Sequence, residues 1–311
     1  MEIFFANGIL ISTDAETGSA EAGSAEAGNE ETGNAHKCIS MHDRALQYGD
    51  GVFETLRIVD GKIPMWKYHL QRLKNAQQIL GLPLDDFFAQ WQSFISEHLG
   101  NVKSACAKLV ISRGEGPRGY KIPQQVSLNW WLLVTDLPVR ETKNEFKLTL
   151  CRHALSRQPR LAGLKHLNRL DQVLARSEWS EQDDFDEGIM FNLDGDVIEG
   201  TMSNIFWLKS GQLFTPDLSQ EGIDGCVRRW VIDQYAQNSN AVAKAEPKAV
   251  TKAVIIEKDA KLDQLLTADA VFLTNSLMGI QQVSQIDGQT IEQNKAIETL
   301  STEFNRQFIQ H

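Results

Sequence analysis

The stretch Leu161-Ala-Gly-Leu-Lys-His-Leu-Asn-Arg-Leu-Asp-Gln-Val-Leu-Ala-Arg-Ser-Glu-Trp179 combines a periodic apolar pattern with a reactive side chain. Its leucines recur at three- and four-residue spacing, so the sequence predicts an amphipathic helix entered through Ala162-Gly163. Lys165 would then lie in the first turn, where the positive end of the helix dipole disfavours a cation. That field, together with the flanking leucines, would lower the pKa of the amine and favour the neutral form that makes a Schiff base.

A lysine in this position also has an ordinary interpretation. Most lysine side chains are solvated and very few are buried, so on its own Lys165 is better explained as a surface residue. Its chemical significance therefore depends on what the rest of the chain supplies.

The composition is that of an ordinary globular protein. The chain has 311 residues, of which 42% are hydrophobic and 23% charged, and this length favours two domains with a sizeable core. No apolar run reaches the roughly 18 residues of a membrane span. The N-terminus also lacks the features of a secretory signal, so we expect a cytoplasmic protein that does not bind membranes.

The cysteines and histidines form no recognisable ligand pattern. Four cysteines and seven histidines are scattered through the chain without a C-x-x-C pair or an H-E-x-x-H motif. We therefore expect neither a disulfide framework nor a metal site.

The net charge of −10 is concentrated near the N-terminus. Residues 13–36 are rich in Gly, Ala, Ser and Glu, and they contain six acidic residues before the first basic residue, Lys37. Such a tract cannot bury enough apolar surface to offset its ordering entropy, so we interpret it as a flexible acidic insertion. No basic stripe with interleaved aromatic residues is present, and nucleic-acid binding is disfavoured.

Turn and periodicity signals outline the first half of the chain. Asn7-Gly8 predicts a hairpin turn between apolar strands, and the pattern further predicts a strand over 52–59, helices over 66–80 and 87–99, and a strand over 105–113. On the first helix, His69 and Arg72 are three residues apart and close enough to share an anion. Solvated side chains are the more common arrangement for such a pair.

The loop after the strand over 105–113 carries glycines at the spacing G-x-G-x-x-G. A dinucleotide site needs a helix directly after these glycines, and Tyr120-Lys-Ile-Pro123 does not permit one. What remains is a mobile loop bearing Arg113 and Arg118 beside the strand residue Lys108. Three cations so placed are suited to holding a carboxylate.

The second half alternates short strands and turns and contains two further candidate groups. Glu199 ends an apolar strand, where a buried carboxylate requires a partner, although a turn or capping residue is the more common explanation. Gly222-Ile-Asp-Gly-Cys-Val-Arg228 leads into a helix, and backbone N–H groups at such a junction are able to bind phosphate. Many junctions of this kind are only turns. A final buried strand over 271–279 ends in polar groups.

Taken together, these pieces resemble the fold-type IV enzymes that depend on pyridoxal phosphate, a family of branched-chain and D-amino-acid aminotransferases and aminodeoxychorismate lyases. The resemblance covers most of the chain from Ile39 onward and is most specific for the lyases. It is carried, in order, by Arg44-Ala-Leu-Gln-Tyr-Gly-Asp-Gly-Val-Phe, His69-Leu-Gln-Arg-Leu, Ser112-Arg-Gly-Glu-Gly-Pro-Arg-Gly-Tyr and Leu161-Ala-Gly-Leu-Lys-His-Leu-Asn-Arg-Leu.

The resemblance implies roles for individual residues. Lys165 would form the internal aldimine with the cofactor, and Glu199 would pair with the pyridinium nitrogen. The cofactor phosphate would be held by Arg72, by the backbone at Cys226 and Val227, and by Asn275 and Ser276. Arg118, Lys108 and Arg113 would bind the substrate carboxylates.

The resemblance also implies a fold, a reaction and a homodimer. We expect an α/β (α+β) architecture with a small domain over 1–121, a linker over 122–126, and a larger pyridoxal phosphate-binding domain over 127–311 with a β-barrel-like sheet. The implied reaction converts 4-amino-4-deoxychorismate to 4-aminobenzoate and pyruvate, a step of folate biosynthesis. An aminotransferase using the same lysine and glutamate is the alternative, and a non-catalytic protein that binds pyridoxal phosphate is a more remote one.

Overall fold

A computed structural model describes residues 2–13, 39–138, 145–242 and 254–309, and the chain divides into two compact units. Unit 1 comprises residues 1–62 and 82–138, and unit 2 comprises residues 63–81 and 139–311. These boundaries differ from the expected ones, because the helix over 66–80 belongs to unit 2 and the strand after the expected linker belongs to unit 1. The acidic insertion over 13–36 falls almost entirely outside the described residues.

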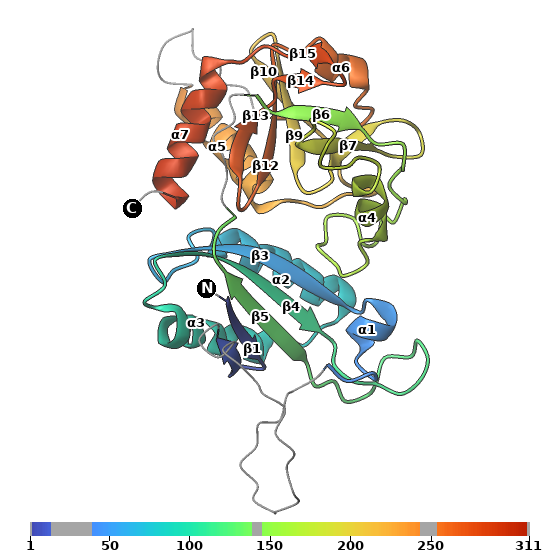
Figure 1. Cartoon of the computed structure of the whole chain (residues 1–311), viewed down its shortest axis with the longest axis vertical. Helices are drawn as coiled ribbons and strands as arrows, with labels where there is room; N and C mark the ends of the chain where they lie inside the picture. Colours follow the sequence, from blue (N-terminus) through green and yellow to red (C-terminus); the bar gives the residue numbers. More distant parts are fainter. Residues whose placement is uncertain (1, 14–38, 139–144, 243–253, 310–311) are drawn as a thin grey trace, which may run out of the picture. The chain divides into compact units, whose positions relative to one another are not determined.

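Unit 1 is an antiparallel sheet with the strand order β2-β1-β5-β4-β3. Its elements are β1 (Glu2–Ala6), β2 (Ile9–Thr13), α1 (Arg44–Tyr48), β3 (Gly51–Val59), α3 (Asp85–Leu99), β4 (Ser104–Ser112) and β5 (Asn129–Thr135) (Figure 1). The predicted hairpin is confirmed, since Asn7 and Gly8 have φ values of 49° and 80° between β1 and β2. Positive φ at both central residues is what a type I′ turn requires.

Aromatic side chains fix α3 to this sheet. Phe94 on α3 makes an edge-to-face contact with Phe5 on β1, with ring centroids 5.1 Å apart, and a second with Trp130 on β5 at 5.0 Å. Such pairs add roughly 0.5–1.5 kcal/mol each beyond their burial. The apolar stripe predicted for this helix is therefore its core-facing side.

Unit 2 contains two five-stranded sheets, with strand orders β11-β10-β9-β12-β13 and β15-β14-β6-β7-β8. Its strands are β6 (Lys147–Leu150), β7 (Glu187–Phe191), β8 (Val197–Gly200), β9 (Asn204–Lys209), β10 (Gln212–Pro216), β11 (Ile255–Glu257), β12 (Ala270–Asn275), β13 (Gly279–Gln282), β14 (Gln285–Ile286) and β15 (Gln289–Thr290). Its helices are α2 (Trp66–Leu80), α4 (Leu170–Arg176), α5 (Cys226–Val242), α6 (Leu262–Leu266) and α7 (Lys295–Phe308).

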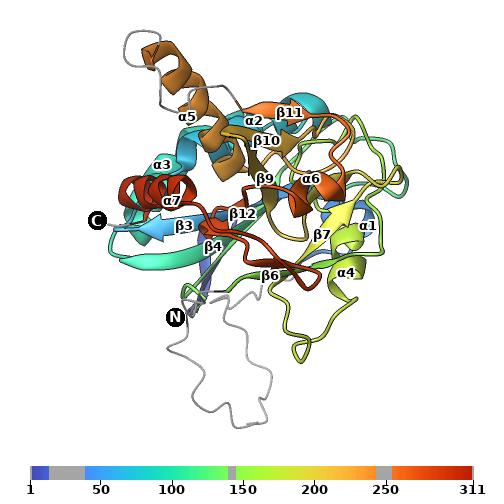
Figure 2. The same cartoon turned by 90° about the horizontal axis from the view of Figure 1, so that it is seen from above.

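Alternating side chains on β9 separate the two cores of unit 2. Ile205 and Trp207 face a cluster shared with strands of the other sheet, whereas Phe206 and Leu208 face a cluster that includes residues of α5 and α7. Figure 2 shows α2 beside α5. The sheet with strand order β11-β10-β9-β12-β13 is thus covered by helices on one face and by the other sheet of unit 2 on its second face.

Two expectations about unit 2 need correction. Within the described residues neither sheet closes into a barrel, so the prediction of a β-barrel-like sheet was wrong. The helix expected to begin at Ala162-Gly163 begins instead at Leu170, and Lys165 lies in an irregular segment ahead of it. Among the described residues, no helix combines the length and the apolar character needed to cross a membrane.

Candidate active site

The segment around Lys165 is held by backbone hydrogen bonds to a distant turn. The amide of Gly163 donates to the carbonyl of Gly222 at 2.9 Å, and the amide of Asp224 donates to the carbonyl of Gly163 at 3.1 Å. Gly163 has a φ of 80°, a left-handed value that no helix begins with. These bonds place Lys165 beside the turn over 222–225 in a segment that is not helical, so the predicted effect of a helix dipole on its amine does not apply.

Glu199 is buried at the strand end where the sequence placed it. It is 3% exposed, and its Oε2 accepts a hydrogen bond from the amide of Ile223 at 2.8 Å. Gln172 donates to its Oε1 at 3.4 Å. Burial raises the pKa of Glu199 to about 7, although the Ile223 hydrogen bond and the charges of Arg169 and Lys165 lower it. Because Gly163 and Glu199 both bond to the turn over 222–224, the chain brings Lys165 to the neighbourhood of this carboxyl group.

The turn over 222–225 is tied to two more residues of the predicted site. Arg72 donates from Nη1 to the carbonyl of Asp224 at 3.2 Å. Asn204 donates to the carbonyl of Ile223 at 2.7 Å and accepts from the amide of Gly225 at 3.0 Å. A Cβ at Gly225 would meet the Asn204 Oδ1 at 2.0 Å, so only glycine fits here.

Helix α5 begins directly after this turn. Cys226 and Val227 are its first two residues, and the first N–H groups of a helix have no partner within it. The charge and hydrogen-bond donors needed for an anion are therefore present at the start of α5, with Arg72 close by. Behind them, the Cys226 Sγ lies 3.4 Å from Nδ1 of His69.

Arg72 and His69 are both buried, at 8% and 1% exposure. The solvated arrangement favoured by the residue pattern alone was therefore wrong. The helix turns these two basic side chains inward together with Leu73 and Ala76.

The end of β12 supplies further polar groups. Asn275 accepts hydrogen bonds from the amides of Leu277 and Met278, at 3.1 and 2.7 Å, and so closes the turn that contains Ser276. Thr274 pairs directly with Asn204 across the strands and therefore lies on the same face of the sheet. Its hydroxyl is buried and has no hydrogen-bond partner among the described residues.

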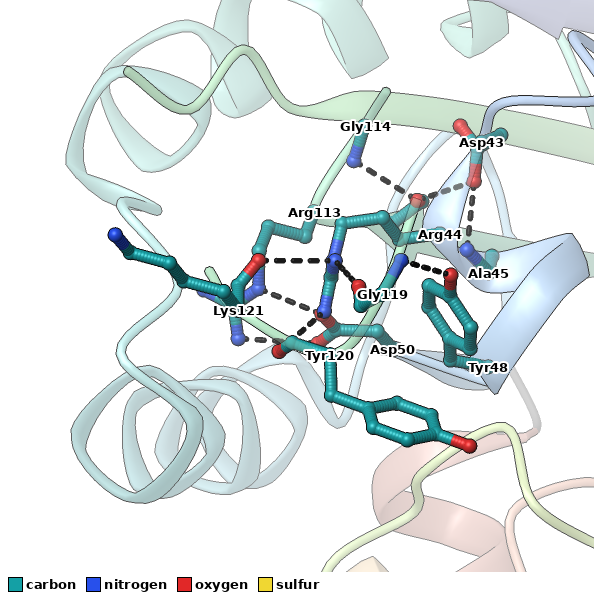
Figure 3. A network of polar contacts seen from close by, with 11 residues as sticks. Asp43, Arg44, Ala45, Tyr48, Asp50, Arg113, Gly114, Gly119, Tyr120 and Lys121 are labelled. Carbon is teal, nitrogen blue, oxygen red and sulfur yellow. Dashed lines mark hydrogen bonds and ion pairs between the residues drawn. The ribbon is translucent and has the colours of Figure 1, made fainter. Parts of the chain in front are cut away.

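In unit 1 the basic loop is anchored by an arginine network (Figure 3). Arg44 donates to the carbonyls of Gly119, Tyr120 and Lys121 at 3.2 to 3.4 Å. The amide of Gly119 also donates to the hydroxyl of Tyr48 at 3.0 Å. These bonds do not support the mobile loop that we expected from its glycines.

The three cations predicted to bind substrate differ in their surroundings. Arg113 is 3% exposed and donates to both oxygens of Asp50, at 2.8 and 3.0 Å. Arg118 and Lys108 are exposed, and the Lys108 amine lies 5.5 Å from the ring centre of Phe53. The charge of Arg113 is therefore already matched within unit 1.

Comparison with known proteins places these features in one family. A family model described as amino-transferase class IV matches residues 51–286. The chain belongs to the class IV aminotransferase family. An aminodeoxychorismate lyase of Vibrio harveyi is 34% identical over 80% of this chain and 87% of its own. A D-alanine aminotransferase of Bacillus licheniformis is 28% identical over 81% and 84%.

A solved structure gives the same result for the fold. The 4-amino-4-deoxychorismate lyase of Pseudomonas aeruginosa superimposes with a TM-score of 0.79 at 31% identity, covering 97% of this chain and 98% of that one. The predicted fold-type IV architecture is confirmed, and the chain is a pyridoxal phosphate enzyme of the class IV family.

The residues present in unit 2 fit that cofactor. Pyridoxal phosphate offers an aldehyde, a ring nitrogen and a phosphate, and the unit presents an amine, a carboxyl group and the N-terminus of a 17-residue helix. The buried Thr274 hydroxyl and the glycine-only contact at Gly225 mark a polar cradle at that helix end. Residue by residue, the assignments stay predictions.

Sequence reasoning missed several residues of this class IV site. Asn204 and Thr274 were overlooked because a single polar residue in an apolar strand carries no motif, yet each lies where a buried strand ends. Gln172, Arg169 and His166 were assigned no role. Their relation to Glu199 depends on the irregular path of the chain from Gly163 to Arg169.

Proposed function

We propose that this chain is a lyase that converts 4-amino-4-deoxychorismate to 4-aminobenzoate and pyruvate in folate biosynthesis. Glu199 is buried, and it and the Lys165 segment bond to the same turn over 222–224, which supports pyridoxal phosphate chemistry but is common to lyases and aminotransferases. The observation that carries the choice of a lyase is the similarity to named relatives. The two relatives described above that exceed 30% identity bear the name of such a lyase. When bound, the cofactor supplies an electron sink for charge that develops beside the substrate nitrogen.

We assign the chemical groups of unit 2 as follows. Lys165 holds the cofactor and then removes the proton from the carbon next to the substrate nitrogen. Glu199 keeps the ring nitrogen protonated and so maintains the electron sink. Phosphate is bound by the N–H groups of Cys226 and Val227 and by the three side chains that the resemblance named, which are Arg72, Asn275 and Ser276.

The substrate carries two carboxylates, and the basic loop of unit 1 offers partners for them. Arg118 and Lys108 are exposed, so we propose that they contact the carboxylates directly. Arg113 is paired with Asp50, so its contribution is to add positive charge and to hold the loop.

One assay separates the lyase from its alternatives. Purified protein loaded with pyridoxal phosphate is incubated with 4-amino-4-deoxychorismate, and 4-aminobenzoate and pyruvate are measured without added keto acid. We expect both products in equal amounts. Amino transfer that requires a keto acid would instead identify an aminotransferase, and the absence of both activities would identify a non-catalytic protein.

A lysine variant tests the assignment of the amine. Lys165→Ala should abolish both the yellow colour of the bound cofactor and product formation, because no other amine takes its place. Lys74, an exposed lysine on α2, provides the matched control, and Lys74→Ala should retain both. Normal colour and activity in Lys165→Ala would contradict the assignment.

We also propose that the enzyme is a homodimer, located in the cytoplasm. Helix α4 carries Leu170, Val173 and Leu174 on one face, and they are 74%, 59% and 50% exposed. Three apolar side chains at helical spacing rarely remain in water on a monomer. A second copy of the chain would cover them.

Sedimentation tests this dimer. The wild type should sediment as a dimer, and Leu170→Ser combined with Leu174→Ser should shift the equilibrium toward monomer by at least tenfold. Ile9→Ser, a like change at an exposed residue of unit 1, should not. A monomeric wild type would refute the proposal.

A further inference from the structure

Two basic side chains at the start of α4 lie in contact. Arg169 directly precedes α4, and Gln172, three residues later, donates to Oε1 of Glu199 at 3.4 Å. The Arg169 Nη2 contacts Nε2 of His166 directly. Both residues are only partly exposed, and the Nε of Arg169 and the Nδ1 of His166 are buried without a hydrogen-bond partner among the described residues. Two basic groups of this kind are compatible only if one of them is neutral.

His166 is the neutral member of the pair. Burial, together with the charge of Arg169, lowers the pKa of His166 to about 4, and Asp171 only partly opposes this. A neutral imidazole accepts a hydrogen bond at one ring nitrogen, so Nε2 is able to accept from the guanidinium. His166 therefore fixes the position of Arg169 without competing with its charge.

The groups that face Glu199 differ in how permanent their charge is. Ile223 and Gln172 offer neutral donors, while Arg169 and Lys165 offer positive charge. Lys165 must give up its proton to act as a nucleophile or a base. Arginine does not deprotonate under these conditions, so among the described groups that act on this carboxyl group Arg169 is the lasting positive charge.

A buried carboxyl group without sufficient positive charge takes up a proton. A protonated Glu199 would only form a hydrogen bond with the cofactor ring nitrogen and would leave that nitrogen neutral. The ring then accepts charge less readily. The electron sink of the proposed reaction thus depends on a charge that Glu199 cannot supply by itself.

We propose that Arg169, held in place by the neutral imidazole of His166, is a positioning residue that keeps Glu199 ionised and thereby keeps the cofactor ring nitrogen protonated. This inference rests on the residue roles under Proposed function and adds a group to them. Arg169 acts through Glu199 and is not assigned any contact with the substrate.

The ring nitrogen itself provides the decisive measurement. Enzyme is loaded with pyridoxal phosphate labelled with ¹⁵N in the ring, and the ¹⁵N chemical shift is recorded for wild type, Arg169→Met and Arg169→Lys. The wild type and Arg169→Lys should show a protonated nitrogen, and Arg169→Met should move toward the neutral value. The kcat of Arg169→Met should fall at least tenfold, while KM changes less than twofold.

The cofactor-free protein gives an independent measurement. The difference in melting temperature between a protein and its Glu199→Gln counterpart is followed against pH, and its midpoint reports ionisation of Glu199. Arg169→Met should raise this midpoint. The control is Arg160→Met, the same change at an exposed arginine nearby, and it should leave the midpoint and the ¹⁵N shift unchanged.

The outcomes separate this inference from the proposed function. A uniform loss of stability in Arg169→Met, with the midpoint and the ¹⁵N shift unmoved, would show a purely structural role and overturn the inference, whatever the wild type catalyses. Should Arg169→Met fail to fold, His166→Gln provides the test, with a smaller shift in the same direction expected. An unmoved shift in that variant would equally overturn it.

Discussion

Asp50 in unit 1 and Glu199 in unit 2 are two acidic residues with opposite electrostatic surroundings. Asp50 accepts hydrogen bonds from Arg44 at 2.7 Å and from Arg113 at 2.8 and 3.0 Å. Burial raises the pKa of Asp50, but the two arginines outweigh it and the net pKa is lowered. Glu199 is more deeply buried, and there the effect of burial prevails, raising its pKa to about 7.

The difference separates a carboxylate that organises the fold from one that is available for chemistry. Two guanidinium groups satisfy Asp50, so it has no need of a ligand. Within the described residues, the hydrogen bonds to Glu199 come from neutral donors, the amide of Ile223 at 2.8 Å and Gln172 at 3.4 Å, and no guanidinium pairs with it directly. A carboxyl group in that condition is suited to bind a cation such as a protonated ring nitrogen.

The largest effect is expected from neutralising Asp50. Asp50→Asn would leave the side chains of Arg44 and Arg113, which are 4% and 3% exposed, without their counter-charge. Breaking a buried ion pair from one side costs about 3–5 kcal/mol, and we expect a loss of that size in the free energy of unfolding, measured by urea denaturation.

The exposed pair of Asp60 and Lys103 provides a matched control in the same unit, since its side chains are 47% and 88% exposed. Surface pairs contribute about 0–1 kcal/mol, so Asp60→Asn should be nearly silent. Equal losses in Asp50→Asn and Asp60→Asn would remove the basis for treating Asp50 as the organising carboxylate of unit 1.

Neutralising Glu199 should give the reverse pattern. Glu199→Gln keeps the shape of the side chain but removes the charge that we propose holds the ring nitrogen, and we expect kcat to fall by about 100-fold. Stability of the cofactor-free protein at pH 8 should stay the same or rise, because a buried charge is no longer required. The measurements are product formation and thermal unfolding, with the exposed Glu181→Gln as control.

The same comparison predicts opposite responses to pH. The pKa of Glu199 is raised on folding, so its contribution to stability is fully present below about 4.5 and is lost as the pH rises through about 7. The pKa of Asp50 is lowered, so its contribution is present above 3.8 and is lost as the pH falls below that value.

Thermal unfolding of cofactor-free wild type, Glu199→Gln and Asp50→Asn between pH 3 and 8 checks these signs. Subtracting the Glu199→Gln curve should reveal a relative loss of wild-type stability between pH 4.5 and 7. Subtracting the Asp50→Asn curve should reveal a relative loss only at the acidic end. A slope of the same sign in both differences would mean that the two carboxylates are electrostatically alike.

Local signals were sufficient for most elements of this fold. The turn at Asn7-Gly8, the helices α2 and α3 and the hairpins of unit 2 follow from turn chemistry and apolar periodicity, which depend on neighbouring residues alone. The path from Gly163 to Arg169 does not. There Gly163 forms its backbone hydrogen bonds with Gly222 and Asp224, about 60 residues away along the chain. The leucines at helical spacing therefore predicted a helix where none forms.

The predicted site has the same division. Lys165, Glu199 and the turn before α5 were predicted because each left a chemical group unexplained in its local context, and the structure places Glu199 and the Lys165 segment on that turn. Asp50 was not found, since one aspartate in a strand approach has no pattern and its two arginines come from separate segments. Long-range ion pairs of this kind are determined by tertiary packing, which local sequence does not encode.

The smallest effect on catalysis is expected where Asp50's network reaches the basic loop, although loss of the buried Arg44–Asp50 pair will also lower stability. Arg44→Met removes the guanidinium that binds the carbonyls of Gly119, Tyr120 and Lys121, and lysine at this position would not span three carbonyls because it lacks a planar fork. Arg118 is next to that anchored segment, so we expect KM to rise about tenfold, or about 1.4 kcal/mol, with kcat less affected. Steady-state kinetics measure the change in KM, and amide exchange over 119–121 measures the loosening of the anchored segment.

The control is Arg152→Met, at an arginine whose side chain is 88% exposed. It should change neither KM nor the exchange rate. Faster exchange with an unchanged KM would mean that the anchor stabilises the loop without positioning Arg118, and the network of Asp50 would then serve folding alone.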